Sequence, residues 1–405
     1  MGRCRVCGGV LAEFADFGRQ PLSDAFLTAD QVAHEYFFRL AVGSCESCTM
    51  VQLVEEVPRE RMFHETYPYV SSGSALMRKH FEQIALRLLK TELTGPDPFL
   101  VEIGCNDGVM LGAVAEAGVR HLGVEPSGRV AQMARARGVR VRNDFFEEST
   151  ALAIRATEGP ADVVYAANTL CHIPYVGSVF RGVDALLAPD GVFVFEDPYL
   201  GEIVARTAFD QIYDEHFYFF TVRSVQAMAR RFGFDLVDVE RLAVHGGELR
   251  YTLARRGARP VSSTVAELLA GEHASGLARR ATLDGFVSAV DRVRDDLLDL
   301  LRRLRADGRR VVGYGATAKS ATVANYCGID RSLVSFVCDT TPAKQGRLTP
   351  GTHLPVKPSQ AFSDPYPDYA LLFAWNHAEE IMAREQGFRE VGGKWILYVP
   401  EVSVI

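Results

Sequence analysis

Apolar strands alternate with helical stretches through most of this chain, and that alternation limits the possible folds more than any other feature. Five segments from 99 to 196 have the apolar character of buried strands: 99–104, 121–125, 139–142, 162–168 and 191–196. Such alternation forms a parallel sheet with helices on both faces, a doubly wound α/β fold. A helix is predicted before them at 74–93, and two further strands after them at 234–242 and 248–254.

The first predicted strand ends in a glycine-bearing turn, FLVEIGCNDGVML. Gly104 closes the strand and Gly108 precedes the next helix, so the backbone can approach a ligand at the carboxyl end of the sheet. The spacing differs from the GxGxxG of dinucleotide enzymes. It resembles motif I of class I S-adenosylmethionine methyltransferases, [DE]xGxxxG. The alternative is a Rossmann-like core whose glycines bind nothing.

Polar residues also follow the next strands. Glu125 stands where a carboxylate can bind the two ribose hydroxyls of a cofactor, and Asn143 with Asp144 follows the third strand, where this fold contacts adenine. The residues predicted to bind S-adenosylmethionine are Glu102, Gly104, Asn106, Asp107, Gly108, Glu125, Pro126, Asn143, Asp144 and Asn168.

Two CxxC pairs, CRVC and CESC, lie near the start of the chain. Four thiolates converging from two turns suit tetrahedral zinc, and they leave no position for water, so the predicted zinc is structural. The long stretch between the pairs predicts a small sheet. Four unrelated thiols and a nucleic-acid zinc finger stay open as alternatives, although no basic face is evident. The predicted metal ligands are Cys4, Cys7, Cys45 and Cys48.

A second glycine loop, GYGATAKS, begins a shorter α/β unit after a long amphipathic helix predicted over 261–307. One interpretation is a dinucleotide site, with Asp339 as the acid that holds a ribose. We favour a pyrophosphate site, because the loop places anionic oxygen at a helix N-terminus. A purely architectural unit is the third interpretation. The predicted substrate-binding residues are Gly315, Lys319, Asn376 and His377.

The order of these motifs carries a resemblance over essentially the whole chain: CxxC…CxxC, ETYPYVSSGS, VEIGCNDG, ANTLCHIP, YDEHFYFF, HGGELR, GYGATAKS. The series resembles the three-domain nucleotide-sugar C-3′-methyltransferases of antibiotic deoxysugar biosynthesis. The resemblance implies methyl transfer from S-adenosylmethionine to C-3 of a dTDP-linked 4-keto-deoxysugar. It also implies a zinc-binding domain at 1–66, a methyltransferase domain at 67–256 and a C-terminal Rossmann-like domain at 257–405.

Methylation beside a ketone needs a base for the C-3 proton and a donor that holds the enolate charge. By the resemblance, His216 is the base, Tyr213 the donor, and Glu215 a partner that orients them. In an extended segment Tyr213 and Glu215 would share a face, so His216 joins them only through a turn. Taken alone, YDEHFYFF favours a half-buried strand.

Two further residues are predicted to reach the site. His172 follows the fourth strand, where cofactor and substrate meet in this fold, and its alternative is a capping or core histidine. Tyr67 matches a family position on the linker between domains, and its alternative is aromatic packing. The rival functions are an NAD(P)-dependent nucleotide-sugar ketoreductase, a bifunctional methyltransferase–ketoreductase, an O-methyltransferase and a zinc-based binding module.

Composition limits the partners. Asp and Glu (51) outnumber Lys and Arg (44), giving a net charge of −7, which argues against wrapping nucleic acid. No segment has the length and apolarity of a membrane span or a secretory signal. We therefore expect a cytoplasmic monomer that takes a small nucleotide-sugar substrate and binds neither nucleic acid nor membrane.

Overall fold

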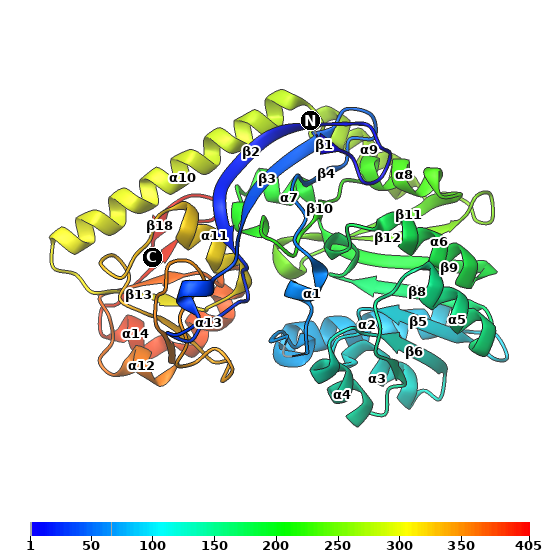
Figure 1. Cartoon of the computed structure of the whole chain (residues 1–405), viewed down its shortest axis with the longest axis horizontal. Helices are drawn as coiled ribbons and strands as arrows, with labels where there is room; N and C mark the ends of the chain where they lie inside the picture. The colour runs from blue at the N-terminus through cyan, green and yellow to red at the C-terminus, as the bar shows by residue number, and fades with distance from the viewer. Residues whose placement is uncertain (1, 66) are drawn as a thin grey trace.

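Three β-sheets, each with its own strand order, organise the computed structural model (Figure 1). The structure describes residues 2–65 and 67–405. In Figure 1 the seven-stranded sheet lies on the right, the six-stranded sheet on the left, and the strands of the five-stranded sheet arch across the top between them. Within the described ranges, no helix is long and apolar enough to cross a membrane.

The five-stranded sheet is antiparallel and has the order β1-β2-β3-β4-β10. Four of its strands confirm the sheet expected around the cysteine pairs: β1 (Gly2–Arg3), β2 (Val10–Pro21), β3 (Phe37–Cys45) and β4 (Val51–Leu53). The fifth, β10 (Tyr218–Phe219), comes from the YDEHFYFF segment far along the chain. The N-terminal sheet is therefore completed by a strand of the segment that carries Tyr213, Glu215 and His216.

The seven-stranded sheet contains every strand predicted up to residue 254 and has the order β11-β12-β9-β8-β5-β6-β7. β5 to β9 run parallel, whereas β12 is antiparallel to both β9 and β11. The bounds are β5 (Phe99–Ile103), β6 (Arg120–Val124), β7 (Val141–Arg142), β8 (Ala161–Ala167), β9 (Leu187–Pro198), β11 (Phe234–Leu242) and β12 (Glu248–Arg255). The predicted α/β fold is confirmed.

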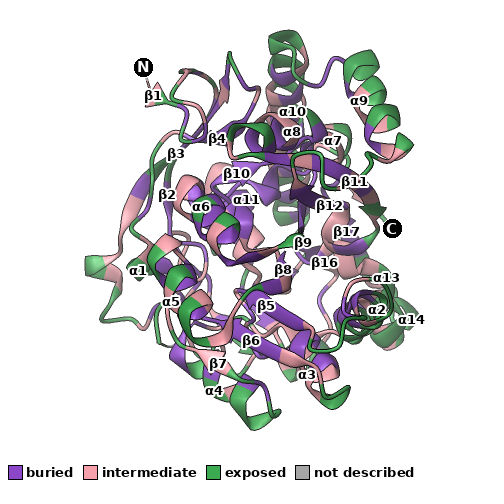
Figure 2. Ribbon diagram, turned by 90° about the vertical axis from the view of Figure 1, so that its right-hand side faces the viewer, coloured by how far each residue is buried: buried purple, intermediate pink, exposed green. Residues whose placement is uncertain are grey.

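Helices cover both faces of this sheet, and its central strands are buried (Figure 2). The longer helices are α2 (Ala75–Thr91), α3 (Val109–Glu116), α4 (Gly128–Ala136), α5 (Glu148–Glu158), α6 (Val176–Leu186), α7 (Leu200–Ala205) and α8 (Val222–Arg231). Short turns are α1 (Arg59–Met62), η1 (Val32–His34), η2 (Ser71–Gly73), η3 (Leu170–His172), η4 (Phe209–Gln211) and η5 (Val244–Gly246). The helix predicted at 74–93 is α2.

The helix predicted over 261–307 is two helices, α9 (Ser263–Ser275) and α10 (Arg280–Ala306). Gly276 ends α9 with φ +65, a left-handed conformation in which glycine carries no steric penalty. The single-helix expectation was therefore wrong. In Figure 1, α10 runs from the N-terminal sheet to the C-terminal domain, and Arg280 Nη1 donates to the carbonyl of Glu13 at 2.9 Å.

The six-stranded sheet has the order β15-β14-β13-β16-β17-β18 and is parallel except for β18. The strands are β13 (Val311–Tyr314), β14 (Val337–Asp339), β15 (Val356–Pro358), β16 (Tyr369–Leu372), β17 (Lys394–Leu397) and β18 (Ser403–Val404). The helices are α11 (Ala318–Tyr326), α12 (Gln360–Ser363), η6 (Trp375–His377), α13 (Ala378–Arg384) and α14 (Gln386–Glu390). The second predicted α/β unit is present.

Candidate active site

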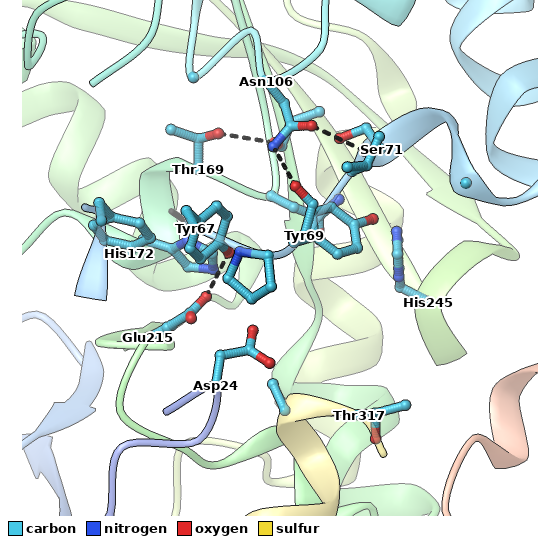
Figure 3. Close-up of a pocket in the computed structure, with 18 of the residues that line it drawn as sticks. Asp24, Tyr67, Tyr69, Ser71, Asn106, Thr169, His172, Glu215, His245 and Thr317 are labelled. Atoms are coloured by element: carbon cyan, nitrogen blue, oxygen red, sulfur yellow. Dashed lines mark hydrogen bonds between the residues drawn. The ribbon is translucent and has the colours of Figure 1, made fainter. Parts of the chain in front are cut away.

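A cavity of about 620 Å³ lies where the carboxyl ends of the central strands meet the C-terminal domain. The linker 67–74 forms one wall, and Figure 3 shows its Tyr67 and Tyr69 pointing among the residues that line the cavity. Asp24, from the N-terminal domain, enters the same space. All three parts of the chain therefore contribute to one cavity, which is large enough for two ligands to meet.

The glycine loop after β5 has the backbone shape that its sequence predicts. Gly104 has φ +70, and a Cβ there would lie 2.4 Å from Thr169 Oγ1. The following loop is held by Glu125, whose Oε2 accepts from the backbone N–H of Asn106 at 2.9 Å and whose Oε1 accepts from that of Ser127 at 2.8 Å. The loop is therefore fixed close to the cavity, and burial raises the pKa of Glu125.

The linker is fastened over this loop. Asn106 Oδ1 accepts from the backbone N–H of Ser71 at 2.9 Å, and its Nδ2 donates to the carbonyl of Tyr69 at 3.4 Å (Figure 3). Arg137 donates both to Asp107 Oδ2 at 2.9 Å and to Ser72 Oγ at 2.8 Å. The linker thus covers the end of the cavity at which the glycine loop lies.

The predicted cofactor residues divide into two groups. Gly104, Asn106, Glu125, Pro126 and Asn168 line the cavity.

The others stand behind the first group. Asp107 pairs with Arg137, as described, and Asn143 Nδ2 donates to the carbonyls of Glu125 and Pro126 at 2.7 and 2.9 Å. Glu102 is buried, and its pKa is raised well above the ordinary value by burial and by neighbouring carboxylates. The remaining two, Gly108 and Asp144, are not among the described residues that line the cavity. For all ten predicted residues, those that line the cavity included, cofactor contact stays a prediction.

A turn brings Tyr213 and His216 together. The backbone N–H of His216 donates to the carbonyl of Tyr213 at 3.1 Å, and the Tyr213 hydroxyl lies 2.8 Å from His216 Nε2. His216 Nδ1 lies 2.8 Å from the carbonyl oxygen of Gln211. Because a carbonyl only accepts, Nδ1 carries the hydrogen and Nε2 holds a lone pair toward the Tyr213 hydroxyl. The alternative of a half-buried strand with its charges in solvent is wrong: the YDEHFYFF segment is buried throughout, and its strand, β10, begins only after this turn.

Burial favours the neutral form of two neighbouring histidines of the cavity, His216 and His172. It lowers the pKa of His216 well below the ordinary value, and the unfavourable interaction that a protonated His216 would have with His172 and with the ammonium of Lys319 lowers it further. Burial also lowers the pKa of His172 to about 4. The His172 ring lies 5.2 Å from that of His216 and stacks at 5.6 Å on Phe63. His216 is therefore an uncharged imidazole at neutral pH, the form that can accept a proton.

Acidic groups gather beside the two histidines. The Tyr67 hydroxyl donates to Glu215 Oε2 at 2.9 Å (Figure 3). Burial, together with the charges of Asp24 and Asp214, raises the pKa of Glu215 well above the ordinary value. Burial raises the pKa of Asp214 to about 6, and its Oδ1 accepts from the backbone N–H of Ser23 at 3.0 Å. Burial therefore favours the protonated form of Glu215, whose carboxyl group is bonded to the linker.

The C-terminal domain closes the far side of the cavity. Three of the four predicted substrate residues, Lys319, Asn376 and His377, line it, whereas a Cβ on Gly315 would meet Ala374 at 2.9 Å. Lys319 Nζ is buried with no hydrogen-bond partner among the described residues, and burial lowers its pKa. A buried ammonium with free donors is suited to an anionic ligand.

Asp339, the acid considered for a nicotinamide cofactor, accepts hydrogen bonds from the backbone of nearby loops. Its Oδ2 accepts from the backbone N–H of Ala316 and its Oδ1 from that of Thr341, both at 2.7 Å. Lys344 Nζ donates to the carbonyl of Ala316 at 2.9 Å and to Asp24 Oδ1 at 3.2 Å. These contacts close the second glycine loop and tie it to the N-terminal domain, so they do not favour the ketoreductase hypothesis.

The four predicted zinc ligands converge at the start of the N-terminal sheet, where their ligand atoms all lie within 4.8 Å of one another. Cys4 Sγ lies 3.6 Å from Cys48 Sγ, and Cys7 Sγ lies 3.4 Å from Cys45 Sγ. Sulfurs about 2.3 Å from a tetrahedral zinc are about 3.8 Å apart. The cluster therefore fits a structural zinc.

Three residues of the site were missed from the sequence. Asp24 had no local motif to mark it. Gln211 lies two residues before Tyr213, the first residue of YDEHFYFF, and only the fold brings its carbonyl to His216. His245 opens the HGGELR motif and lines the cavity, where burial lowers its pKa to about 3. The two glycines that follow His245 were the available signal, because both have positive φ.

The strand order, the antiparallel β12 and the glycine loop at the end of β5 define an S-adenosylmethionine-dependent methyltransferase of class I. Three family models match in series: a zinc binding domain at 4–63, a methyltransferase domain at 76–239 and a C-methyltransferase C-terminal domain at 243–400. The chain is 36% identical to C-methyltransferase NovU from Streptomyces niveus, covering 99% of this chain and 96% of that one. The chain therefore belongs to the S-adenosylmethionine-dependent C-methyltransferases that carry an N-terminal zinc-binding domain.

Two further comparisons cover less than half of the chain. A ubiquinone biosynthesis O-methyltransferase from Cupriavidus pinatubonensis is 29% identical over 38% of this chain and 68% of its own. The crystal structure of magnesium protoporphyrin IX methyltransferase from Synechocystis PCC 6803 with bound S-adenosylmethionine is 13% identical, with a TM-score of 0.33, over 44% of this chain and 79% of its own.

Proposed function

We propose that the enzyme methylates C-3 of a dTDP-linked 4-keto-deoxysugar through an enolate, with His216 as the base. The observation that carries this proposal is the neutral His216 in the same cavity as the glycine loop, with its Nδ1 hydrogen donated to Gln211 and its Nε2 lone pair held by a hydroxyl. Carbon beside a ketone becomes nucleophilic only when its proton is removed, so this reaction needs a base at C-3. O-methylation also uses a base, and the product distinguishes the two reactions.

The residues at the cavity divide into two groups by the part of the reaction that they would serve. Gly104, Asn106 and Glu125 lie at the end that suits S-adenosylmethionine, which supplies an electrophilic methyl group when it is bound. Lys319, Asn376 and His377 lie at the opposite end, where the diphosphate of the sugar nucleotide would be held. This arrangement leaves the sugar between them, beside His216 and Tyr213.

In the proposed reaction His216 Nε2 takes the C-3 proton and the electrons of the C–H bond form the enolate. Burial raises the pKa of Tyr213 well above the ordinary value, so Tyr213 stays a phenol and can donate to the oxygen at C-4. Glu215 accepts a hydrogen bond from Tyr67 and so holds the linker. The enolate carbon would then form a bond to the methyl group as the bond from that methyl group to sulfur breaks, with its electron pair leaving on sulfur as S-adenosylhomocysteine. The proton on His216 is returned to solvent after product leaves.

The product identifies the reaction. Enzyme, S-adenosylmethionine and a dTDP-4-keto-deoxysugar should give a methyl singlet on a quaternary carbon in the NMR spectrum, and His216→Asn should lower turnover about 10²–10⁴-fold. A methoxy signal would assign O-methylation instead.

Proton removal can be followed separately from methyl transfer. With S-adenosylhomocysteine in place of the methyl donor, the wild type should exchange the C-3 proton with deuterated water and His216→Asn should not, after subtraction of spontaneous exchange. A His216→Asn enzyme that exchanges at the wild-type rate would remove His216 from this role.

A further inference from the structure

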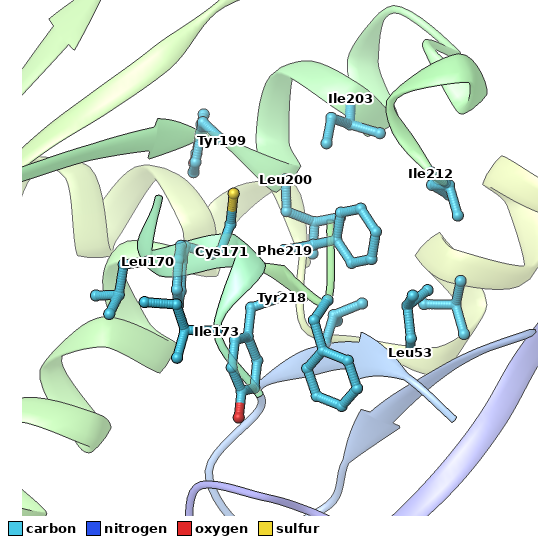
Figure 4. Packing of buried hydrophobic residues seen from close by; sticks show 14 of the residues in the cluster. Leu53, Leu170, Cys171, Ile173, Tyr199, Leu200, Ile203, Ile212, Tyr218 and Phe219 are labelled. Carbon is cyan, nitrogen blue, oxygen red and sulfur yellow. The ribbon is translucent and has the colours of Figure 1, made fainter. Parts of the chain in front are cut away.

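The segment from Phe209 to Phe219 is held by the N-terminal domain at one end. β10 pairs with β4, Tyr218 opposite Gln52 and Phe219 opposite Val51, and the backbone N–H of Leu53 donates to the carbonyl of Phe217 at 2.9 Å. Figure 4 shows Leu53 in one apolar cluster with residues of this segment, Ile212, Tyr218 and Phe219. The carboxyl end of the segment is therefore fixed by strand pairing and apolar packing.

The C-terminal domain holds the other end. Asp210 is fully buried, and its Oδ2 accepts from Trp375 Nε1 at 2.6 Å and from the Tyr398 hydroxyl at 2.9 Å. Thr322 Oγ1, on α11, donates to the carbonyl of Ile212 at 2.7 Å. Three hydrogen bonds from one domain thus converge on two residues of the neighbouring domain. A buried carboxylate is stable only with such donors, so their geometry fixes η4 strongly.

Gln211 lies between these two anchored residues, and its carbonyl is the acceptor for His216 Nδ1. Its side-chain Nε2 donates to the carbonyl of His245 at 2.8 Å. His245 has φ 50, and a Cβ on the next residue, Gly246, would lie 2.8 Å from the Trp375 ring. The position of the Gln211 carbonyl is therefore set by Asp210 and Ile212 on either side and by the HGG turn behind.

We propose that the C-terminal domain positions the catalytic base: Trp375, Tyr398 and Thr322 are positioning residues that place the Gln211 carbonyl against His216. The inference rests on the proposed function, because it takes His216 as the group that receives the C-3 proton. The carbonyl fixes the tautomer of His216 in which Nδ1 carries the hydrogen and Nε2 carries the lone pair, and it stabilises the imidazolium that forms. In this arrangement the second Rossmann-like unit acts on the reaction through the turn 209–211 as well as by lining the cavity.

The two tryptophans of the chain give a matched pair of variants. Trp375→Phe removes the indole N–H that bonds Asp210 and keeps an aromatic ring. Trp395→Phe is the control, because Trp395 is buried in the same domain and its Nε1 has no hydrogen-bond partner among the described residues. Tyr398→Phe and Thr322→Val each remove one further donor with little change of shape, and they keep the test valid should one variant fold poorly.

Each variant is measured for kcat, for C-3 proton exchange in the presence of S-adenosylhomocysteine, and for the affinity and stoichiometry of S-adenosylhomocysteine by calorimetry. The stoichiometry gives the folded fraction. A displaced base should lower kcat and exchange about 10–100-fold in Trp375→Phe, with unchanged S-adenosylhomocysteine affinity. With C-3-deuterated substrate the isotope effect on kcat should rise, because proton removal becomes slower relative to methyl transfer. A smaller folded fraction alone would leave the isotope effect on kcat unchanged.

The possible results separate the two proposals. Wild-type exchange in Trp375→Phe, Tyr398→Phe and Thr322→Val, with His216→Asn inactive, overturns the positioning role and leaves the base assignment standing. Equal losses in Trp375→Phe and Trp395→Phe, or losses matched by the folded fraction, also overturn it by assigning a structural role. Wild-type exchange in His216→Asn instead overturns the proposed function.

Discussion

Gly104→Ala tests the close approach at the end of β5. An alanine there must adopt φ +70, which costs about 1–2 kcal/mol for a residue with a Cβ. Its Cβ also meets Thr169 Oγ1 at 2.4 Å and Cγ2 at 2.7 Å, and overpacking of this kind costs about 1–3 kcal/mol. Together these terms predict a loss of about 2–5 kcal/mol in the free energy of folding.

Gly118→Ala separates the two terms. Gly118 has φ +73, nearly that of Gly104, and a Cβ there has nothing within 4 Å. Its predicted loss is the conformational term alone, about 1–2 kcal/mol. The double variant Gly104→Ala/Thr169→Ala removes Oγ1 and Cγ2 and leaves a Cβ contact at 3.1 Å, so it should regain stability relative to Gly104→Ala.

Thermal and urea denaturation measure the stability, and calorimetry with S-adenosylhomocysteine measures the effect on the cavity. Gly104→Ala should weaken S-adenosylhomocysteine binding about tenfold or more, since the loop that carries Asn106 must move by a sizeable fraction of an ångström. Gly118→Ala should bind like the wild type. A Gly104→Ala enzyme as stable as Gly118→Ala, or one that Thr169→Ala does not improve, would refute the close approach as described.

Two further predictions concern the zinc cluster and the acidic group beside the linker. Cys45→Ser should lower the zinc content, measured by metal analysis, from one per chain and unfold the N-terminal domain, because structural zinc contributes about 10–16 kcal/mol in small zinc domains. The control is Cys327→Ser, which changes a buried cysteine outside the cluster and should leave the zinc content unchanged. Burial raises the pKa of Asp214 from 3.8 to about 6, so its stabilising contribution is full below pH 3.8 and is lost as pH rises through about 6. Asp214→Asn should remove that loss, up to about 3 kcal/mol, and an unchanged pH dependence of unfolding would contradict the shift.

Periodicity predicted the methyltransferase sheet well because its strands are set by local pattern. The predicted bounds of β11 are the observed ones, and the other strands differ by a few residues at their ends. The prediction of one long helix was wrong because of a single residue. The apolar pattern continues through 261–307, but Gly276 adopts a left-handed conformation that ends α9, and the chain turns there. Amphipathic periodicity predicts which face of a helix is buried, but it does not predict a change of backbone conformation at a single residue.

The candidate site was predicted in part, and the limit is physical. Tyr213 and His216 could be paired from the sequence on the condition of a turn between them, and the turn is present. The contacts that hold this turn could not be predicted, since they join Asp210 to Trp375 and Tyr398, and Ser23 to Asp214. Such contacts depend on how three domains pack, and one sequence without relatives carries no signal for that packing.

The burial of the site bears directly on the proposed proton transfer. A proton that moves from carbon to neutral His216 creates two opposite charges from uncharged groups, and in a medium of low polarity the pair is stable only when its members stay close together. Burial is the largest cause of the lowered pKa of His216, and Lys319 adds a smaller one. Under the proposed function, a diphosphate bound at Lys319 would offset that positive charge and remove this smaller cause, whereas the effect of burial would remain. The diphosphate would therefore favour the imidazolium that forms when His216 takes the proton.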